Sequence, residues 1–159
     1  MRLDWVLLLI LLQPIIANAS AGNWEFKSSV DEFTDEKKAS AMVDAAGGVR
    51  NGFIHVACFP SGIEVKISAG KYIGDKAIDD NVKYRVDKNE FVVTTMEPTS
   101  KSYVYMNDKN SQFLKDLMHG KKVVIQLTSY DYDTSTASFS LNGAETAISK
   151  VLALCNDKE

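Results

Sequence analysis

The chain of 159 residues carries a formal net charge of −3, and its acidic and basic residues are interspersed along the sequence without forming a basic cluster. This balance argues against nucleic acid as a ligand. The sequence also contains no phosphate-binding Walker loop and no dinucleotide-binding fingerprint, so neither class of nucleotide-binding protein is expected.

The N-terminus has the pattern of an export signal. Trp5–Leu12 is an apolar block, and Ala17-Asn18-Ala19 is a small-x-small cleavage site that precedes Ser20. The apolar block is shorter than the roughly 20 residues that span a bilayer, which favours a cleaved signal over a membrane anchor. We therefore predict a signal peptide over residues 1–19, a periplasmic or secreted location without a stable membrane anchor, and a single β-rich domain over residues 20–159.

The first part of the mature chain predicts a strand, a turn and an ambiguous segment. Apolar and polar residues alternate over Trp24–Lys27, which favours a strand, and the polar Val30–Asp35 favours a turn. Lys37–Ala46 has a composition that favours a helix, yet its alternating small and apolar residues also fit a strand. Gly47-Gly48 ends the segment in either case.

Short apolar runs separated by turn residues follow, which is typical of hairpins. Asp108–His119 predicts a short helix that ends at Gly120. The predicted strands are Gly52–Phe59, Ile63–Ser68, Val82–Val86, Phe91–Thr95, Ser102–Met106, Lys122–Ser129 and Thr134–Leu141. This series predicts a mainly β chain, an antiparallel β-sandwich or open barrel with a short internal helix and a C-terminal amphipathic helix.

The C-terminal run predicts that helix. Asn142-Gly143 breaks the preceding strand, and Glu145 follows Asn142 at the spacing of a capping box. The apolar residues that recur at helical spacing are Ala144, Ala147, Ile148, Val151, Leu152 and Cys155. They form one face, which we expect to pack on the core.

The two cysteines both lie in the predicted mature chain. An exported chain with two cysteines favours a disulfide between Cys58 and Cys155, and the alternative is two buried free thiols. The bridge would join a buried strand to the final helix. No metal site is expected, since His55 and His119 lack the spacing of zinc ligands.

Several pieces taken in order resemble a group of small exported bacterial proteins. They are a Trp24-led strand, Asp31-x-Phe33-Thr34-Asp35, the Cys58 strand, Val82-Lys83-Tyr84-Arg85-Val86-Asp87, a Phe113/Leu114 helix ending at Gly120, Phe139-Ser140-Leu141-x-Gly143, Ala147-Ile148 and Cys155. The chain looks like the type VI secretion-associated periplasmic proteins and the invasion-associated-locus-B-like proteins. The resemblance implies a β-sandwich with a C-terminal helix, a strand at Lys37–Ala46 and an accessory or binding role, and it carries over no catalytic residues.

Two motifs suggest chemistry without completing it. Asp131-x-Asp133 begins like a calcium loop, but Thr136 stands where such a loop needs glycine and Asn142 where it needs glutamate. His55 has the chemistry of a general base, yet no nucleophile motif accompanies it. A surface-facing strand histidine is the simpler interpretation.

Other residues suggest a binding surface. Arg85 and Asp87 lie two apart on a predicted strand, so they share a face, whereas Tyr84 points to the other face. With Lys83 they suit partner recognition, and the alternative is a solvated face with a weak ion pair. Tyr130 and Tyr132, like Tyr103 and Tyr105, are two apart, so each pair would present two rings on one face. Exposed rings would suit a binding surface, and buried rings would belong to the core.

Together these features predict an exported, non-enzymatic accessory protein that binds an envelope or secretion-system protein and needs no cofactor. The alternatives are a small-ligand-binding β module and a periplasmic hydrolase that uses His55.

Overall fold

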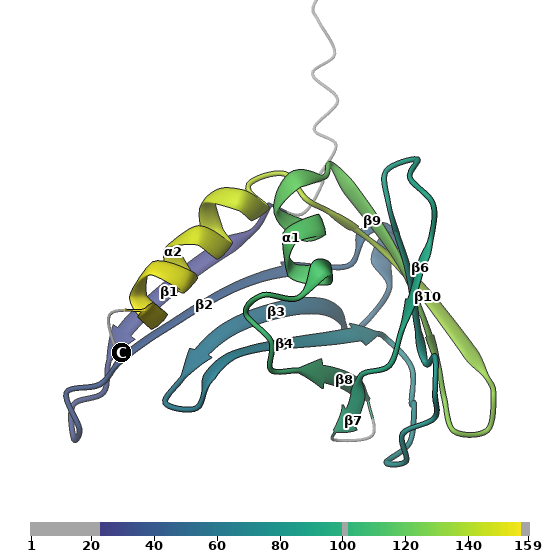
Figure 1. The fold of residues 1–159 in the computed structure, drawn as a ribbon, viewed down its shortest axis with the longest axis horizontal. Helices are drawn as coiled ribbons and strands as arrows, with labels where there is room; N and C mark the ends of the chain where they lie inside the picture. Colours follow the sequence, from purple (N-terminus) through teal and green to yellow (C-terminus); the bar gives the residue numbers. More distant parts are fainter. Residues whose placement is uncertain (1–22, 100–101, 157–159) are drawn as a thin grey trace, which may run out of the picture.

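The computed structural model describes residues 23–99 and 102–156, so the predicted signal peptide lies outside the described residues. The described residues form two antiparallel sheets and two α-helices (Figure 1). Neither helix in this part of the chain has the length and apolar character that crossing a membrane requires.

Sheet A has the strand order β1-β2-β3-β4-β8-β7, and sheet B has the order β10-β9-β5-β6. The strands of sheet A are β1 (Glu25–Val30), β2 (Lys37–Asp44), β3 (Gly52–Phe59), β4 (Gly62–Ala69), β7 (Glu97–Thr99) and β8 (Tyr103–Met106). The strands of sheet B are β5 (Val82–Val86), β6 (Val92–Thr94), β9 (Lys122–Thr128) and β10 (Thr134–Ser140). The helices are α1 (Gln112–His119) and α2 (Ala144–Asn156), and a short 3-10 helix covers Ala46–Gly48.

The core lies on the inner face of sheet A, where sheet B covers one part and α2 covers the strands β1 to β4. Alternate side chains of each strand point into this core, as a half-buried strand requires. The largest fully buried side chains include Ile54 and Ile67 from sheet A, Ile125, Leu127 and Phe139 from sheet B, Leu114 and Leu117 from α1, and Ile148 from α2. Burying each such side chain contributes about 1.5–3 kcal/mol. The fold is therefore a β-sandwich whose second layer is completed by helices, which confirms the predicted fold class.

The ambiguous segment Lys37–Ala46 is a strand over most of its length. Ala39, Ala41 and Val43 point into the core, while Met42 and Asp44 face solvent. The strand pairs with β1 on one side and β3 on the other. Tertiary pairing and the alternating burial thus override the helical propensity of the alanines.

Several strand ends differ by a residue from the sequence-based expectation, and the start of the first helix, the length of β6 and the presence of β7 are further differences with a physical reason. The first helix begins at Gln112 and not at Asp108, because the Ser111 hydroxyl caps it by accepting from the Leu114 amide at 3.2 Å. Phe91 lies outside β6, which is only three residues long. Strand β7 was not expected, since it contains Pro98, and it lies at the edge of sheet A, where a proline is tolerated.

The C-terminal helix begins at Ala144, so Gly143 and not Asn142 directly precedes it. Gly143 has a φ of 82°, a conformation that glycine adopts at low cost. The side-chain amide of Asn142 instead donates to the Asn23 side chain at 3.3 Å. The expected capping box is therefore wrong, whereas the predicted apolar face of the helix does pack on the core.

The predicted disulfide is present in the structure and joins Cys58, near the end of β3, to Cys155, in the last turn of α2. Their Cα atoms lie 5.5 Å apart, and 97 positions separate them in the sequence. Closing so long a loop restricts the unfolded chain and stabilises the fold by about 4–5 kcal/mol in the loop-entropy model. The bridge holds α2 against the inner face of sheet A.

Candidate protein-binding surfaces

Sheet B turns two neighbouring cations outward from strand β5. Burial alternates along this strand, with Val82, Tyr84 and Val86 inside and Lys83 and Arg85 exposed. The cross-strand partner of Lys83 on β9 is Gln126, and that of Arg85 is Val124. A hollow of about 310 Å³ lies here, lined by Lys83, Tyr84, Arg85, Phe91, Val124, Gln126 and Thr136.

No carboxylate on the strands of sheet B can pair with these cations. None of the four strands of sheet B contains aspartate or glutamate. Among the described residues, no ion pair involves Lys83 or Arg85, and Lys83 instead lies over the Phe91 ring at 4.9 Å from its centroid. We call this surface the basic face and define it as the outward side chains around the hollow, with Lys122 at its margin; they are Lys83, Arg85, Phe91, Val124, Gln126 and Thr136. It is suited to an acidic and partly apolar segment of a partner.

Tyr84 belongs to the core and not to this surface. It is 2% exposed, and its ring packs edge-on against Phe113 with the ring centroids 4.8 Å apart. Its hydroxyl donates to the Asp116 carboxylate at 2.9 Å. Burial, together with Asp116, raises the pKa of this phenol. Its ring therefore supports the basic face from beneath instead of presenting itself to a partner.

Asp87 ends strand β5 in a left-handed conformation with a φ of 53°. Its carboxylate accepts hydrogen bonds from the backbone amides of Lys121 and Lys122, at 3.1 and 2.9 Å. These bonds hold the β5–β6 turn against the start of β9. Among the described residues, no ion pair joins Asp87 to Arg85, which was the alternative interpretation of this face, and the Asp87 carboxylate instead holds the turn.

Tyr130 and Tyr132 lie in the β9–β10 turn, beyond the end of the strands away from Arg85. Tyr132 is 77% exposed, and Tyr130, 44% exposed, packs edge-on against Tyr72. The structure thus does not bring these two rings together with Arg85 into one site. They remain candidates for a separate contact.

The outer face of sheet A carries His55. Met42 and Lys66 are its cross-strand partners, and the ring is half-buried. Burial lowers the pKa of His55, the Lys66 ammonium lowers it further, and Glu64 opposes them. Within the described residues no hydrogen bond joins His55 to a serine, threonine or carboxylate, so the geometry adds nothing to the hydrolase hypothesis. A shallow hollow of about 470 Å³ lies beside it, lined in part by Lys27, Lys38, Ser40 and Phe59.

The remaining polar motifs serve local structure. The Ser129 hydroxyl donates to the Asp131 carboxylate, which lowers the pKa of Asp131, and both residues belong to the β9–β10 turn. His119 ends α1, where its Nδ1 lies 2.7 Å from the Lys115 carbonyl oxygen. In the part of the chain that the structure describes, no three histidine, cysteine, aspartate or glutamate side chains are grouped to hold a metal ion.

One exposed residue was not singled out by the sequence as a site. Phe33 stands in the turn between β1 and β2 and is 98% exposed. The sequence pattern that could have identified it is a single aromatic residue in a predicted turn, flanked by Asp31, Glu32, Asp35 and Glu36. A turn was expected there, but a sequence pattern does not say whether its one aromatic ring folds back onto the protein.

The comparisons establish the fold alone. No family model matches the chain, and no curated protein matches it. The chain is similar to the crystal structure of invasion associated protein B from Bartonella henselae, with a TM-score of 0.56 and 17% sequence identity. The match covers 88% of this chain and 97% of that one. The resemblance to invasion-associated-locus-B-like proteins is therefore confirmed for the fold, and no comparison supports a link to type VI secretion.

Proposed function

We propose that this chain is an exported, non-enzymatic accessory protein that binds another envelope or secreted protein through the basic face of sheet B. The observation that carries the proposal is the pair Lys83 and Arg85, exposed beside apolar side chains on strands without a single carboxylate. Exposed cations that form no ion pair within the described residues gain most from an anionic partner, and the apolar side chains of the hollow add burial.

Two observations favour an extracytoplasmic location for this binding. The Cys58–Cys155 disulfide is typical of proteins from oxidising compartments. The N-terminal sequence has the pattern of a cleaved export signal. The partner is therefore sought in the periplasm or among secreted proteins, and it should present an acidic segment with at least one apolar side chain.

The test is affinity capture from periplasmic extract with immobilised mature protein. The K83E/R85E variant reverses both cations, while a K76E/K115E variant makes the same change in net charge at other exposed lysines. We expect proteins that are retained by the wild type and by K76E/K115E, released by salt and absent with K83E/R85E. Retention of the same proteins by all three baits would overturn the assignment of the basic face.

A second candidate function is small-ligand binding in the hollow on sheet A. Its volume of about 470 Å³ falls in the range of ligand pockets, and Lys27, Lys38 and His55 lie around an apolar floor that includes Phe59. A thermal-shift screen with small anionic metabolites tests it. Stabilisation of the wild type that His55→Ala abolishes would support this function, and no shift across the screen would remove it.

A further inference from the structure

The turn between β1 and β2 is rich in acidic residues, whereas the basic face carries cations. We define the hairpin tip as residues Asp31–Glu36. Four carboxylates flank Phe33 in the sequence, one of which, Asp31, is paired with Lys38, and the Phe33 ring is 98% exposed. A single exposed apolar side chain needs no explanation by itself. Here the aromatic ring stands at the end of a hairpin and within a strongly acidic segment.

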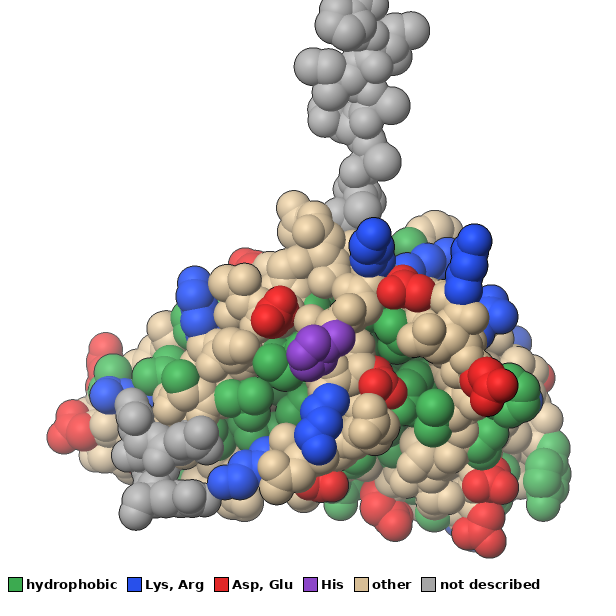
Figure 2. Space-filling view, turned by 45° about the horizontal axis from the view of Figure 1, so that its top comes forward, with side chains coloured by type: hydrophobic (Ala, Val, Ile, Leu, Met, Phe, Trp, Pro, Cys, Tyr) green, Lys and Arg blue, Asp and Glu red, His purple; other side chains and the backbone are tan. Residues whose placement is uncertain are grey.

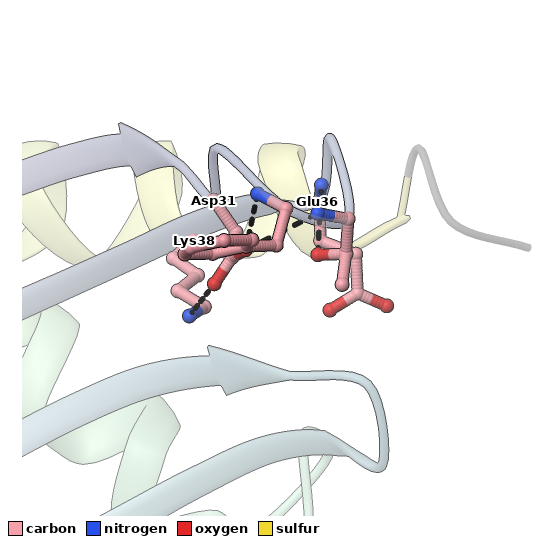
Figure 3. Close-up of polar contacts among 5 residues, drawn as sticks. Asp31, Glu36 and Lys38 are labelled. Atoms are coloured by element: carbon pink, nitrogen blue, oxygen red, sulfur yellow. Dashed lines mark hydrogen bonds and ion pairs between the residues drawn. The ribbon is translucent and has the colours of Figure 1, made fainter.

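The hairpin tip is held in one conformation by its own hydrogen bonds (Figure 3). One oxygen of the Asp31 carboxylate accepts from the Phe33 amide at 3.0 Å and from the Thr34 amide at 3.2 Å. The other oxygen receives the Lys38 ammonium at 2.6 Å, and the Asp31 amide donates to the Glu36 carbonyl at 2.8 Å. These bonds restrain the backbone that carries Phe33, and such restraint before contact lowers the entropic cost of docking.

The hairpin tip complements the basic face in charge. The hairpin tip offers carboxylates and one aromatic ring. The basic face offers Lys83 and Arg85 beside a hollow of about 310 Å³, whose lining includes Phe91 and Val124. The helix side of the molecule offers no comparable area, since Figure 2 shows basic and acidic side chains interspersed there. Figure 1 places the hairpin tip and sheet B at opposite ends of the molecule. One copy therefore cannot bring them together, whereas two copies can.

We propose that this chain associates with a second copy of itself head to tail, with Phe33 of one copy inserted into the hollow of sheet B of the next. The proposal rests on the proposed function, because it takes the basic face as the binding surface and names its occupant. The contact is heterologous, so each bound pair keeps one free hairpin tip and one free basic face, and chains or rings can grow. Its small area makes it a weak and salt-sensitive contact.

Two variants break opposite sides of the contact. F33A removes the ring from the hairpin tip, and K83E/R85E reverses the cations of the basic face. The side chains of Phe33, Lys83 and Arg85 are all exposed, so the variants should fold. Circular dichroism and thermal unfolding would check this. Sedimentation equilibrium of the disulfide-bonded mature protein, from micromolar to millimolar concentration at low salt, then measures association.

We expect the weight-average mass of the wild type to rise with concentration past that of a dimer, and each variant alone to stay monomeric. A mixture of the two variants should form a dimer and grow no further, because only the intact tip of one and the intact face of the other can pair. Y132A, which removes an exposed ring from a different turn, should associate like the wild type.

A wild type that stays monomeric throughout would overturn the proposal, as would a mixture that fails to dimerise. Growth of the mixture beyond a dimer would overturn the single-contact geometry. These failures are distinct from a failure of the proposed function. A monomeric wild type that still captures a periplasmic protein, and loses it in K83E/R85E, would leave the basic face in place with a different occupant.

Discussion

Sheets A and B expose alternate side chains in the same way, yet their outer faces treat charge differently. On sheet A, Lys27 lies 3.3 Å from Glu25 and Lys66 lies 2.5 Å from Glu64. On sheet B, the strands carry no carboxylate, and within the part of the chain that the structure describes neither Lys83 nor Arg85 forms an ion pair. A face that neutralises its own cations is complete in the monomer, whereas an uncompensated face is available to a partner.

The two sheets also differ in what holds them. Sheet A is tied to α2 by the Cys58–Cys155 bridge. Replacing both cysteines by alanine should therefore lower the free energy of unfolding by about 4–5 kcal/mol. Denaturant unfolding measures this loss, with reduced wild type as the control. In native buffer the same variant should retain binding through the basic face. A decrease of less than about 1 kcal/mol in the free energy of unfolding would contradict the stabilising role of the bridge.

Neighbouring residues of β5 separate stability from binding. Tyr84→Phe removes the hydrogen bond to Asp116 and should lower the free energy of unfolding by about 1–2 kcal/mol. Arg85→Ala changes an exposed side chain and should stay within about 0.5 kcal/mol of the wild type while it weakens partner capture. Equal stability losses in both variants would show that the two faces of β5 are not distinct.

His55 makes the stability of sheet A depend on pH. Its pKa is lowered in the folded protein from the ordinary value of 6.5, so the unfolded chain binds more protons below that pH. This contribution is complete above pH 6.5 and is lost as the pH falls through the folded-state pKa. His55→Gln should flatten this part of the pH dependence of the urea midpoint, and an unchanged slope would contradict the assignment.

The smallest expected effect concerns the hairpin tip. The bond to Lys38, followed by that from the Phe33 amide, lowers the pKa of Asp31 to about 2. The tip should thus stay ordered above the ordinary carboxyl value of 3.8 and loosen as the pH falls toward 2. At neutral pH, Asp31→Asn should speed hydrogen exchange of the Phe33 and Thr34 amides relative to their intrinsic rates. Unchanged exchange would mean that the carboxylate does not order the tip.

Much of this fold was predictable because period-two burial is a strong local signal. It places Lys83 and Arg85 on the face opposite Val82 and Val86, and it identifies most strands. The disulfide followed from the count of cysteines and the export pattern. The strand β7 escaped prediction because Pro98 weakens the pattern, and the cap of α2 did so because Gly143, and not Asn142, meets the conformational demand of the turn.

The candidate site was less predictable, because it depends on tertiary neighbours. The alternation of side chains along a strand places Tyr84 and Arg85 on opposite faces of β5. It does not show that the Tyr84 hydroxyl donates to Asp116, which lies on a helix 32 positions away in the sequence. Nor does it show that the Asp87 carboxylate accepts from the Lys122 amide at the start of β9, and that it forms no ion pair with Arg85 among the described residues. The exposure of Phe33 likewise depends on where the hairpin projects, and a local pattern does not encode that.

The most direct test of the basic face is hydrogen exchange of the wild type with and without a partner captured from periplasmic extract. We predict slower exchange in β5, β6 and β9 on binding and unchanged exchange in β3 and β4. Protection confined to β3 and β4 would place the partner on the outer face of sheet A, where charges are already compensated, and would contradict the account.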